Sequence, residues 1–486
     1  MVIKNNGILF IPVICGGLCF LSLFFWLDSV ISDDHSLLFY SSTLFCVFLA
    51  SLLIFYMSLC SMLVEQMTAL LLSAYYTHRV IVLYFLPDQF YYKKISVTAE
   101  GLYITSLYYL VFVLAISIGF YFGRYRFIKS GNNVLYQPVA ESLDNHSDCS
   151  YISLFGLKVE QNRLFSIALK IYILASIVSI INMLLGFGVK GQIYDQYGPI
   201  DSARKALVDM SPVLSLYALY AIFSHPDNRR LKRLAQLSLV FFLLQGIIHS
   251  SRGFVFSILI VYILVMRLER RPIAKYFYVV AGLGVTFIIF VFFPFITVLR
   301  AYMLSGSVYV DSFTDIFMSA ILSFSERLGL YDVLYLYLNV SVWDYVSYSP
   351  LLQEVIDLIN NLVIGDIITP SEYINLSKVQ VLMGGGYVDL LEIGGHAENQ
   401  GGLVSPYIYF GQLGALFYLA LWSFLLIKLE KSHIHPFWRI ALINSYLVSF
   451  MSGGGFVVMH NTLLVFFIYS FILFLFVKIS VSLHLK

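Results

Sequence analysis

Residues 229–275 read RRLKRLAQLSLVFFLLQGIIHSSRGFVFSILIVYILVMRLERRPIAK, which is a basic segment, two apolar runs and a second basic segment. The apolar runs, residues 234–249 and 253–267, are joined by the short link His249-Ser250-Ser251-Arg252-Gly253. Links on the cytoplasmic side of membrane proteins carry an excess of Lys and Arg, so both basic segments are expected there. The two runs then form a hairpin of membrane-spanning helices that places Arg252 on the opposite, outward side.

The composition extends this interpretation to the whole chain. Of 486 residues, 59% are hydrophobic and only 12% are charged, whereas about 25% of a soluble domain is charged. Backbone groups within a bilayer must hydrogen-bond internally, so apolar runs of about 20 residues predict helices. The sequence contains no basic block of the kind that binds nucleic acid. The partner that the composition implies is the lipid bilayer. We expect an all-α polytopic membrane protein with about twelve transmembrane helices, over residues 7–27, 37–62, 67–87, 101–123, 164–186, 211–225, 234–249, 253–267, 275–298, 402–427, 437–459 and 462–480.

The remaining charges fix the expected orientation. Residues 428–439 and residues 124–129 are basic and are expected on the cytoplasmic side. The first outward link instead carries Asp28, Asp33 and Asp34. Both termini are therefore expected in the cytoplasm.

The expected span over residues 67–87 is the weakest, because His78 and Arg79 lie near its middle. An interfacial helix would explain the two charges without any function. An arginine within a membrane usually faces a polar cavity, so the same pair is also a hint of function.

The chain divides into a transmembrane bundle over residues 1–298, a large outward loop over residues 299–401, and C-terminal spans over residues 402–486. Apolar residues at helical spacing within the loop predict helices that lie on, or dip into, the outer leaflet. The loop is either a cap over the bundle or a cap that also forms a substrate cleft. The cytoplasmic link over residues 124–163 is polar and is expected to be solvated and flexible.

The cysteines indicate no structural disulfide and no thiol metal site, because none falls in a segment expected outside the cytoplasm. Cys15, Cys19, Cys46 and Cys60 fall in expected spans and Cys149 falls in a cytoplasmic link. The N-terminal apolar run has no small-residue cleavage site, so it is expected to be a retained first span.

Three outward arginines are candidates for anion binding: Arg204, Arg252 and Arg300. Arg204 could instead pair with a nearby carboxylate, and Arg300 could cap the carbonyl groups of the span that precedes it. Arg252 is harder to explain structurally, because a tight outward turn between two spans offers few carboxylates. Its planar guanidinium suits phosphate oxygens.

A glycine-rich stretch directly before the span at 402–427 is the densest candidate motif. It contains Gly384-Gly385-Gly386-Tyr387 and Gly394-Gly395-His396-Ala397-Glu398-Asn399. Paired glycines permit tight turns and close backbone approach to a ligand, and a histidine can accept a proton near neutral pH. We assign His396 as a catalytic candidate, and Tyr387 and Asn399 as candidate sugar contacts. A solvated loop histidine is the structural alternative for His396.

These groups suit glycosyl transfer from a polyprenyl diphosphate sugar. A positioned base helps the acceptor hydroxyl to lose its proton, and arginines stabilise the departing diphosphate. No strong outward metal-binding cluster is present beyond Asp33-Asp34-His35, so the arginines favour a metal-free reaction without a cofactor.

The order of these features resembles the bacterial O-antigen polymerases of the Wzy type, which are related to the O-antigen ligases. The resemblance covers about twelve spans with a late outward loop, the Ser251-Arg252-Gly253 link, Arg300, the stretch from His396 to Asn399, and Tyr409-Phe410-Gly411-Gln412-Leu413-Gly414. It lacks the paired Arg-x10-Gly loop motifs of some polymerases.

The resemblance implies an inverting, metal-independent glycosyltransferase with a GT-C-like fold in the bacterial inner membrane. Such an enzyme joins undecaprenyl-diphosphate-linked oligosaccharide repeat units at the periplasmic face, during synthesis of O-antigen or a related polysaccharide of the cell surface. Arg252 and Arg300 would hold the diphosphate. His396 would serve the acceptor hydroxyl, or Glu398 would be the base with His396 orienting it. A polysaccharide chain-length regulator is the partner that the resemblance implies.

Three other functions fit parts of the pattern. A ligase would share the chemistry and use a lipid A core as acceptor. Another GT-C enzyme would use Asp33 or Asp34 with a divalent metal. A flippase for lipid-linked oligosaccharides would show charges inside the bundle and two related halves.

Overall fold

The computed structural model describes residues 10–31, 40–60, 62–86, 90, 95–129, 151–184, 214–224, 228–248, 253–269, 295, 329–341, 349, 351–352, 383, 401–432, 434–452 and 455–484. The chain forms two compact units. The first comprises residues 1–126, 274–432 and 446–459, and the second comprises residues 127–273, 433–445 and 460–486.

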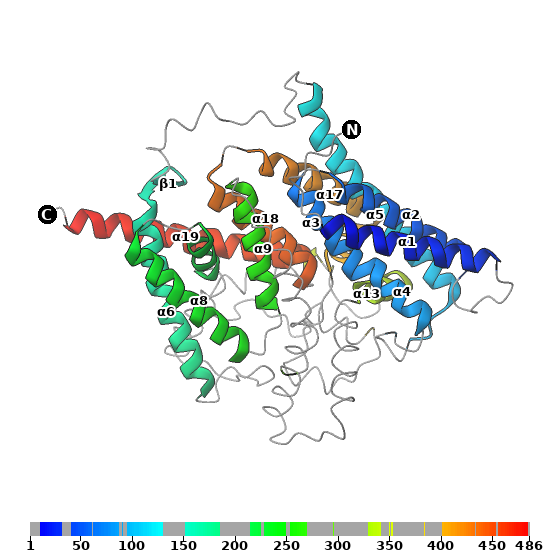
Figure 1. The fold of residues 1–486 in the computed structure, drawn as a ribbon, viewed down its shortest axis with the longest axis horizontal. Helices are drawn as coiled ribbons and strands as arrows, with labels where there is room; N and C mark the ends of the chain where they lie inside the picture. The colour runs from blue at the N-terminus through cyan, green and yellow to red at the C-terminus, as the bar shows by residue number, and fades with distance from the viewer. Residues whose placement is uncertain are drawn as a thin grey trace. The chain divides into compact units, whose positions relative to one another are not determined.

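The first unit is helical. Its elements, all but η1 labelled in Figure 1, are α1 (Phe10–Ile31), α2 (Ser41–Ser58), α3 (Leu63–Leu72), the π-helical segment η1 (Ser73–Thr77), α4 (His78–Phe85), α5 (Ala99–Lys129), α13 (Leu330–Asn339) and α17 (Gly401–Glu430).

The second unit begins with a short hairpin of strands and continues with helices. Its elements are β1 (Tyr151–Leu154), β2 (Leu157–Glu160), α6 (Gln161–Leu184), α8 (Arg229–Ile248) and α9 (Gly253–Leu268). Two C-terminal helices, α18 (Pro436–Ser452) and α19 (Gly455–His484), include residues of both units.

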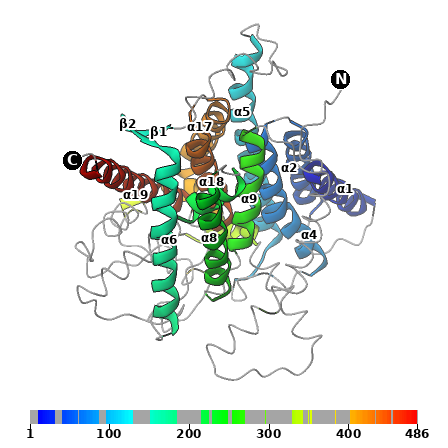
Figure 2. The ribbon, with the colours of Figure 1, turned by 60° about the vertical axis from the view of Figure 1, so that its left-hand side comes forward.

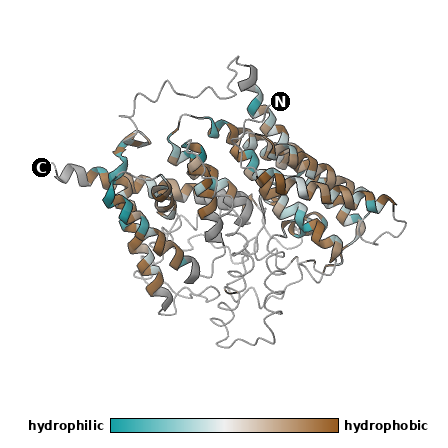
Figure 3. Ribbon diagram, viewed as in Figure 1, coloured by the Kyte–Doolittle hydropathy of each residue, from teal (hydrophilic) through white to brown (hydrophobic). Residues whose placement is uncertain are grey.

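Five helices in the described part of the chain are long and apolar enough to cross a membrane. They are Phe10–Ile31, Ser41–Ser58, Ala99–Tyr125, Gln161–Ile181 and Gly402–Glu430, and Figure 3 shows how strongly apolar residues dominate such helices. Each coincides with an expected span, so the prediction of a largely α-helical chain with helices that can cross a membrane is confirmed. Further expected spans are overlapped by the helices from α3 to α4, Leu214–Phe223, α8, α9, α18 and α19. Of the expected span 275–298, only residue 295 is described. The total of twelve and the GT-C-like arrangement stay predictions.

Helices α1 and α2 form an antiparallel pair. Ser22 and Ser51 contact through their hydroxyl groups at 3.3 Å, and the rings of Trp26 and Phe48 stack with centroids 5.7 Å apart. Near the end of α1, Phe25 also stacks on Tyr84 of α4 at 4.8 Å. The end of α1 and the end of α4 therefore lie at the same end of this unit.

Helices α5 and α17 run in the same direction, and glycines allow them to approach closely. The rings of Tyr108 and Tyr407 meet edge to face at 6.1 Å near the start of both helices. Further along, a side chain at Gly119 would collide with the Ala420 carbonyl oxygen, and one at Gly123 would lie 2.9 Å from Ile427 Cβ. Their shared direction agrees with the alternation of the expected spans, in which residues 101–123 and 402–427 both run inward.

Residues 151–160 form an antiparallel hairpin, β1 paired with β2, directly before α6 (Figure 2). The turn uses Phe155 and Gly156, whose φ angles of 47° and 79° are both positive, as a two-residue hairpin turn requires. Ile152 is fully buried, and the Trp438 indole donates a hydrogen bond to the Ser153 carbonyl oxygen at 3.1 Å. The prediction of a solvated, flexible link was therefore wrong for this part of residues 124–163, because alternate side chains of the hairpin face an apolar core.

Candidate functional site

A buried ion pair lies inside the first unit, at the position where the sequence carries a charge in an apolar run. The Arg79 Nη2 atom lies 2.6 Å from Asp332 Oδ2, and Arg79 Nε donates to Asp332 Oδ1 at 3.0 Å. Neither side chain is exposed to solvent. The planar guanidinium therefore contacts the carboxylate with two of its nitrogens, which is a strong and directional geometry.

The local backbone at Arg79 is unusual. The chain from Leu63 to Phe85 is helical throughout, but Ser73–Thr77 forms a π-helical segment between α3 and α4. The extra residue in such a segment changes the direction of the side chains that follow it, and π-helical turns are frequent at functional sites. His78 and Arg79 are the first two residues after the segment.

Asp332 comes from the expected outward loop, 253 residues later in the chain. It lies in the first turn of α13, where every residue from Leu330 to Tyr337 is buried. This helix is therefore part of the first unit's interior, and it does not merely cover the unit. The loop contributes a charged group to the same buried site as α4.

Hydrogen bonds of two tyrosine hydroxyl groups connect α13 to the start of α5. Tyr331 shares a hydrogen bond of 2.7 Å with Ser106, and the Tyr335 hydroxyl accepts one of 3.0 Å from the Thr98 backbone N–H. Gly101 permits this contact, since a Cβ at that position would lie 2.6 Å from the Tyr335 oxygen. The start of α5 and α13 thus share a buried polar surface.

A second tyrosine contact lies beside the π-helical segment. Thr77 Oγ1 and the Tyr109 hydroxyl are 2.9 Å apart, and the Tyr109 ring stacks on Tyr76 with centroids separated by 5.3 Å. Hydroxyl groups of this kind satisfy polar atoms where water does not reach. The cluster around Arg79 and Asp332 is therefore polar, buried and formed by several elements.

The desolvation of two charges costs several kcal/mol per ion, so a buried ion pair is weak evidence for a stabilising role. Charged residues inside membrane segments usually mark a functional path or a required conformation. The geometry shows one use directly: the pair joins α13 to α4 inside the first unit.

The seven residues that the sequence predicts for substrate binding and catalysis lie outside the described residues. They are Arg204, Arg252, Arg300, Tyr387, His396, Glu398 and Asn399. The structure does describe the helices that follow two of them: α9 begins at Gly253, directly after Arg252, and α17 begins at Gly401.

Sequence reasoning noticed Arg79 but missed its partner. Asp332 and the tyrosines at 331 and 335 stand in the segment Leu330–Asn339, which reads LYDVLYLYLN. An acid among apolar residues at helical spacing is a signal of a buried charge, and it was available in the sequence.

A comparison of the chain with models of protein families, with curated proteins and with solved structures found no match. The function must therefore be argued from the residues and their geometry.

Proposed function

We propose that this protein is a membrane glycosyltransferase that joins lipid-diphosphate-linked oligosaccharide repeat units, as an O-antigen polymerase does. In this proposal Arg252, Arg300 and Arg204 bind the diphosphate, and His396 or Glu398 accepts the proton of the acceptor hydroxyl. Tyr387 and Asn399 contact the sugar. The undecaprenyl carrier, the periplasmic face, and a chain-length regulator as partner belong to the same proposal.

The observation that carries this proposal is the burial of α13 beside the start of α5. A polymerase that acts at a membrane face needs its outward loop to be positioned on the transmembrane helices. Tyr335 contacts Thr98, directly before α5, and Tyr331 contacts Ser106 of α5. Both contacts lie close to the level at which Tyr108 meets Tyr407 of α17. Glu398 precedes Gly401 by three residues, so chain geometry alone keeps its Cα within about 11 Å of the start of α17.

The test is an assay of purified protein with an undecaprenyl-diphosphate-linked repeat unit in the presence of EDTA. Wild-type protein should form a ladder of polymers, and Arg252→Ala should lose activity by about 100-fold or more, because the leaving diphosphate loses a bidentate contact. Arg252→Lys should also fail, since lysine keeps the charge without the fork.

The matched control is Arg230→Ala, which removes an exposed arginine from the start of α8. It should leave the ladder unchanged. Full activity of Arg252→Lys would contradict the assigned role of the arginine, and loss of the ladder in EDTA would favour a metal-dependent GT-C enzyme.

The buried Arg79–Asp332 pair favours a second candidate, a flippase for lipid-linked oligosaccharides. Charges inside the bundle are expected of a transporter, and the pair meets that expectation. Folded wild-type protein that forms no polymer, but moves a labelled lipid-linked oligosaccharide across proteoliposomes, would establish this candidate and reject the polymerase.

A further inference from the structure

A second polar cluster lies at the opposite end of the first unit, where four elements meet. Arg124, near the end of α5, places Nη2 3.3 Å from Glu65 Oε1 at the start of α3. Its Nη1 donates to the Cys60 sulfur, after the end of α2, at 2.7 Å. The Glu430 carboxylate at the end of α17 accepts hydrogen bonds from the Leu63 and Val64 backbone N–H groups at 2.8 and 2.9 Å.

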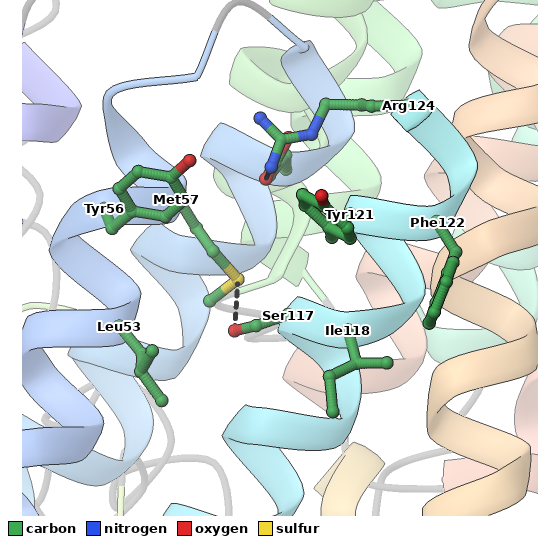
Figure 4. Close-up of a pocket in the computed structure, with 9 residues that line it drawn as sticks. Leu53, Tyr56, Met57, Ser117, Ile118, Tyr121, Phe122 and Arg124 are labelled. Carbon is green, nitrogen blue, oxygen red and sulfur yellow. Dashed lines mark hydrogen bonds and ion pairs between the residues drawn. The ribbon is translucent and has the colours of Figure 1, made fainter. Parts of the chain in front are cut away.

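A pocket of about 430 Å³ opens between α2 and α5 beside this cluster. Its walls are apolar and aromatic, and Figure 4 shows Leu53, Met57, Ile118 and Phe122 around the hollow with Arg124 at one end. Within the described residues, the charged groups that line it are Arg124 and Glu65. The pocket therefore has the shape of an amphiphile site, with a long apolar part and a charge at its end.

The pocket lies on a face that is open to the surroundings of the protein. The exposed fractions of Ile118 and Phe122 are 42% and 57%, although both belong to a helix that is apolar and long enough to cross a membrane. Around such a helix, the surroundings are acyl chains rather than water. A lipid chain could therefore enter the pocket sideways from the bilayer.

The two charges are not equally accessible. The Glu65 side chain is 1% exposed and the Arg124 side chain is 21% exposed, so Glu65 lies behind the arginine. Glu65 Oε2 is buried and has no hydrogen-bond partner among the described residues. Burial raises the pKa of Glu65 to about 7, against the opposing effect of Arg124, so near neutral pH its carboxylate only partly cancels the positive charge. Contact with Glu65 and Cys60 meanwhile fixes the orientation of the guanidinium.

We infer that this pocket binds an anionic phospholipid of the bilayer, with Arg124 contacting the phosphate and one acyl chain lying along Leu53, Ile118 and Phe122. A guanidinium matches phosphate oxygens in geometry and charge. Lys431 lies near the same cluster, and Glu430 is engaged by the start of α3. The guanidinium at the end of the pocket therefore favours an anionic headgroup over a zwitterionic one.

The test of this inference does not depend on glycosyl transfer, because it measures the binding of lipid to the protein. The full chain, purified in detergent, is titrated with phosphatidylglycerol, with phosphatidylcholine and with undecaprenyl phosphate, and bound lipid is counted by native mass spectrometry. Phosphatidylglycerol should bind at least about tenfold more tightly than phosphatidylcholine, as expected for one charge-assisted contact. Equal binding of the two phospholipids would overturn the inference, and tighter binding of undecaprenyl phosphate would replace the phospholipid with a polyprenyl carrier.

Two variants test the site. Arg124→Gln should weaken phosphatidylglycerol binding by about tenfold or more, whereas Lys428→Gln removes a positive charge at the same end outside the pocket and should have no effect. Ile118→Trp fills the pocket from an exposed position and leaves the Arg124–Glu65 contact in place, so it should block binding in a protein whose thermal melting is unchanged. Retention of binding in both Arg124→Gln and Ile118→Trp would show that the lipid binds elsewhere.

Discussion

Arg79 and Asp332 form an ion pair at a position where neither side chain reaches solvent. Removal of one partner breaks a buried charge pair and costs more than the replacement of both by apolar side chains. We predict that Asp332→Asn lowers the free energy of unfolding by about 3–5 kcal/mol. The double variant Arg79→Met with Asp332→Leu should recover most of this loss. Thermal unfolding in detergent checks both, and a double variant as unstable as the single one would contradict the prediction.

Glu65 should make stability depend on pH. Its folded pKa of about 7 lies above the ordinary value of 4.5 because burial favours the neutral carboxyl. The contribution to stability is therefore complete below about pH 4.5 and is lost as the pH rises through about 7. The groups facing Glu65 are Arg124, Cys60, Glu430 and Lys431.

Glu65→Gln removes this titration and should flatten the dependence, with a difference of about 2–3 kcal/mol across pH 5 to 8. Unfolding measured at several pH values checks the result. Glu100→Gln, at an exposed position at the start of α5, is the control and should leave the profile as it is in the wild-type protein.

For single residues, the sequence showed which position in an apolar run carries a charge, but it did not show which residue pairs with that charge. Arg79 was noticed because a cation in an apolar run is visible locally. Asp332 was missed because its role depends on a contact across 253 residues. The candidate catalytic residues His396 and Glu398 stay predictions, since they lie outside the described residues.

Among the elements, the contact of α5 with α17 depends on the absence of a side chain at Gly119. A methyl group there would meet the Ala420 carbonyl oxygen and lie 2.8 Å from the Ser423 Cβ, and backbone cannot move aside cheaply. We predict that Gly119→Ala lowers the free energy of unfolding by about 1–3 kcal/mol, as overpacking does.

Gly17 of α1 provides the matched comparison, because a Cβ there would meet nothing within 4 Å. Gly17→Ala should be neutral or stabilise the protein by about 0.5–1 kcal/mol, since alanine favours a helix. Chemical denaturation of the two variants side by side measures the difference. Equal effects would show that α5 and α17 are not in close contact.

Hydropathy predicted where helices run but not where they deviate. The bounds of α9, Gly253–Leu268, agree closely with the expected span 253–267. The non-helical backbone at Gly411, with φ of 66° and ψ of −170°, divides α17 by a kink, and the apolar pattern of residues 402–427 continues through it. Such a break depends on glycine's access to positive φ, which periodicity does not register.

For the whole molecule, the direction of the helices in the membrane is the testable quantity. The structure relates the helices of the first unit to one another, and the basic links predict which end faces the cytoplasm. A topology reporter inserted after residue 228 should show that this position lies in the cytoplasm. A reporter inserted after residue 345 should show that this position lies outside the cytoplasm. The reverse pattern would place Arg252 and the long loop in the cytoplasm and would overturn the proposed catalytic site.

The distance along the chain between buried partners sets the timing of folding during synthesis. Asp332 is synthesised 253 residues after Arg79. Glu430, which accepts a hydrogen bond from the Leu63 backbone N–H, is synthesised 367 residues after Leu63. At about 5–20 residues per second, the ribosome needs about 10–50 s to supply the partner of Arg79. During that interval Arg79 lacks the Asp332 carboxylate that it contacts in the folded protein. A chain released before residue 332 therefore cannot form this buried pair, however long it remains in the membrane.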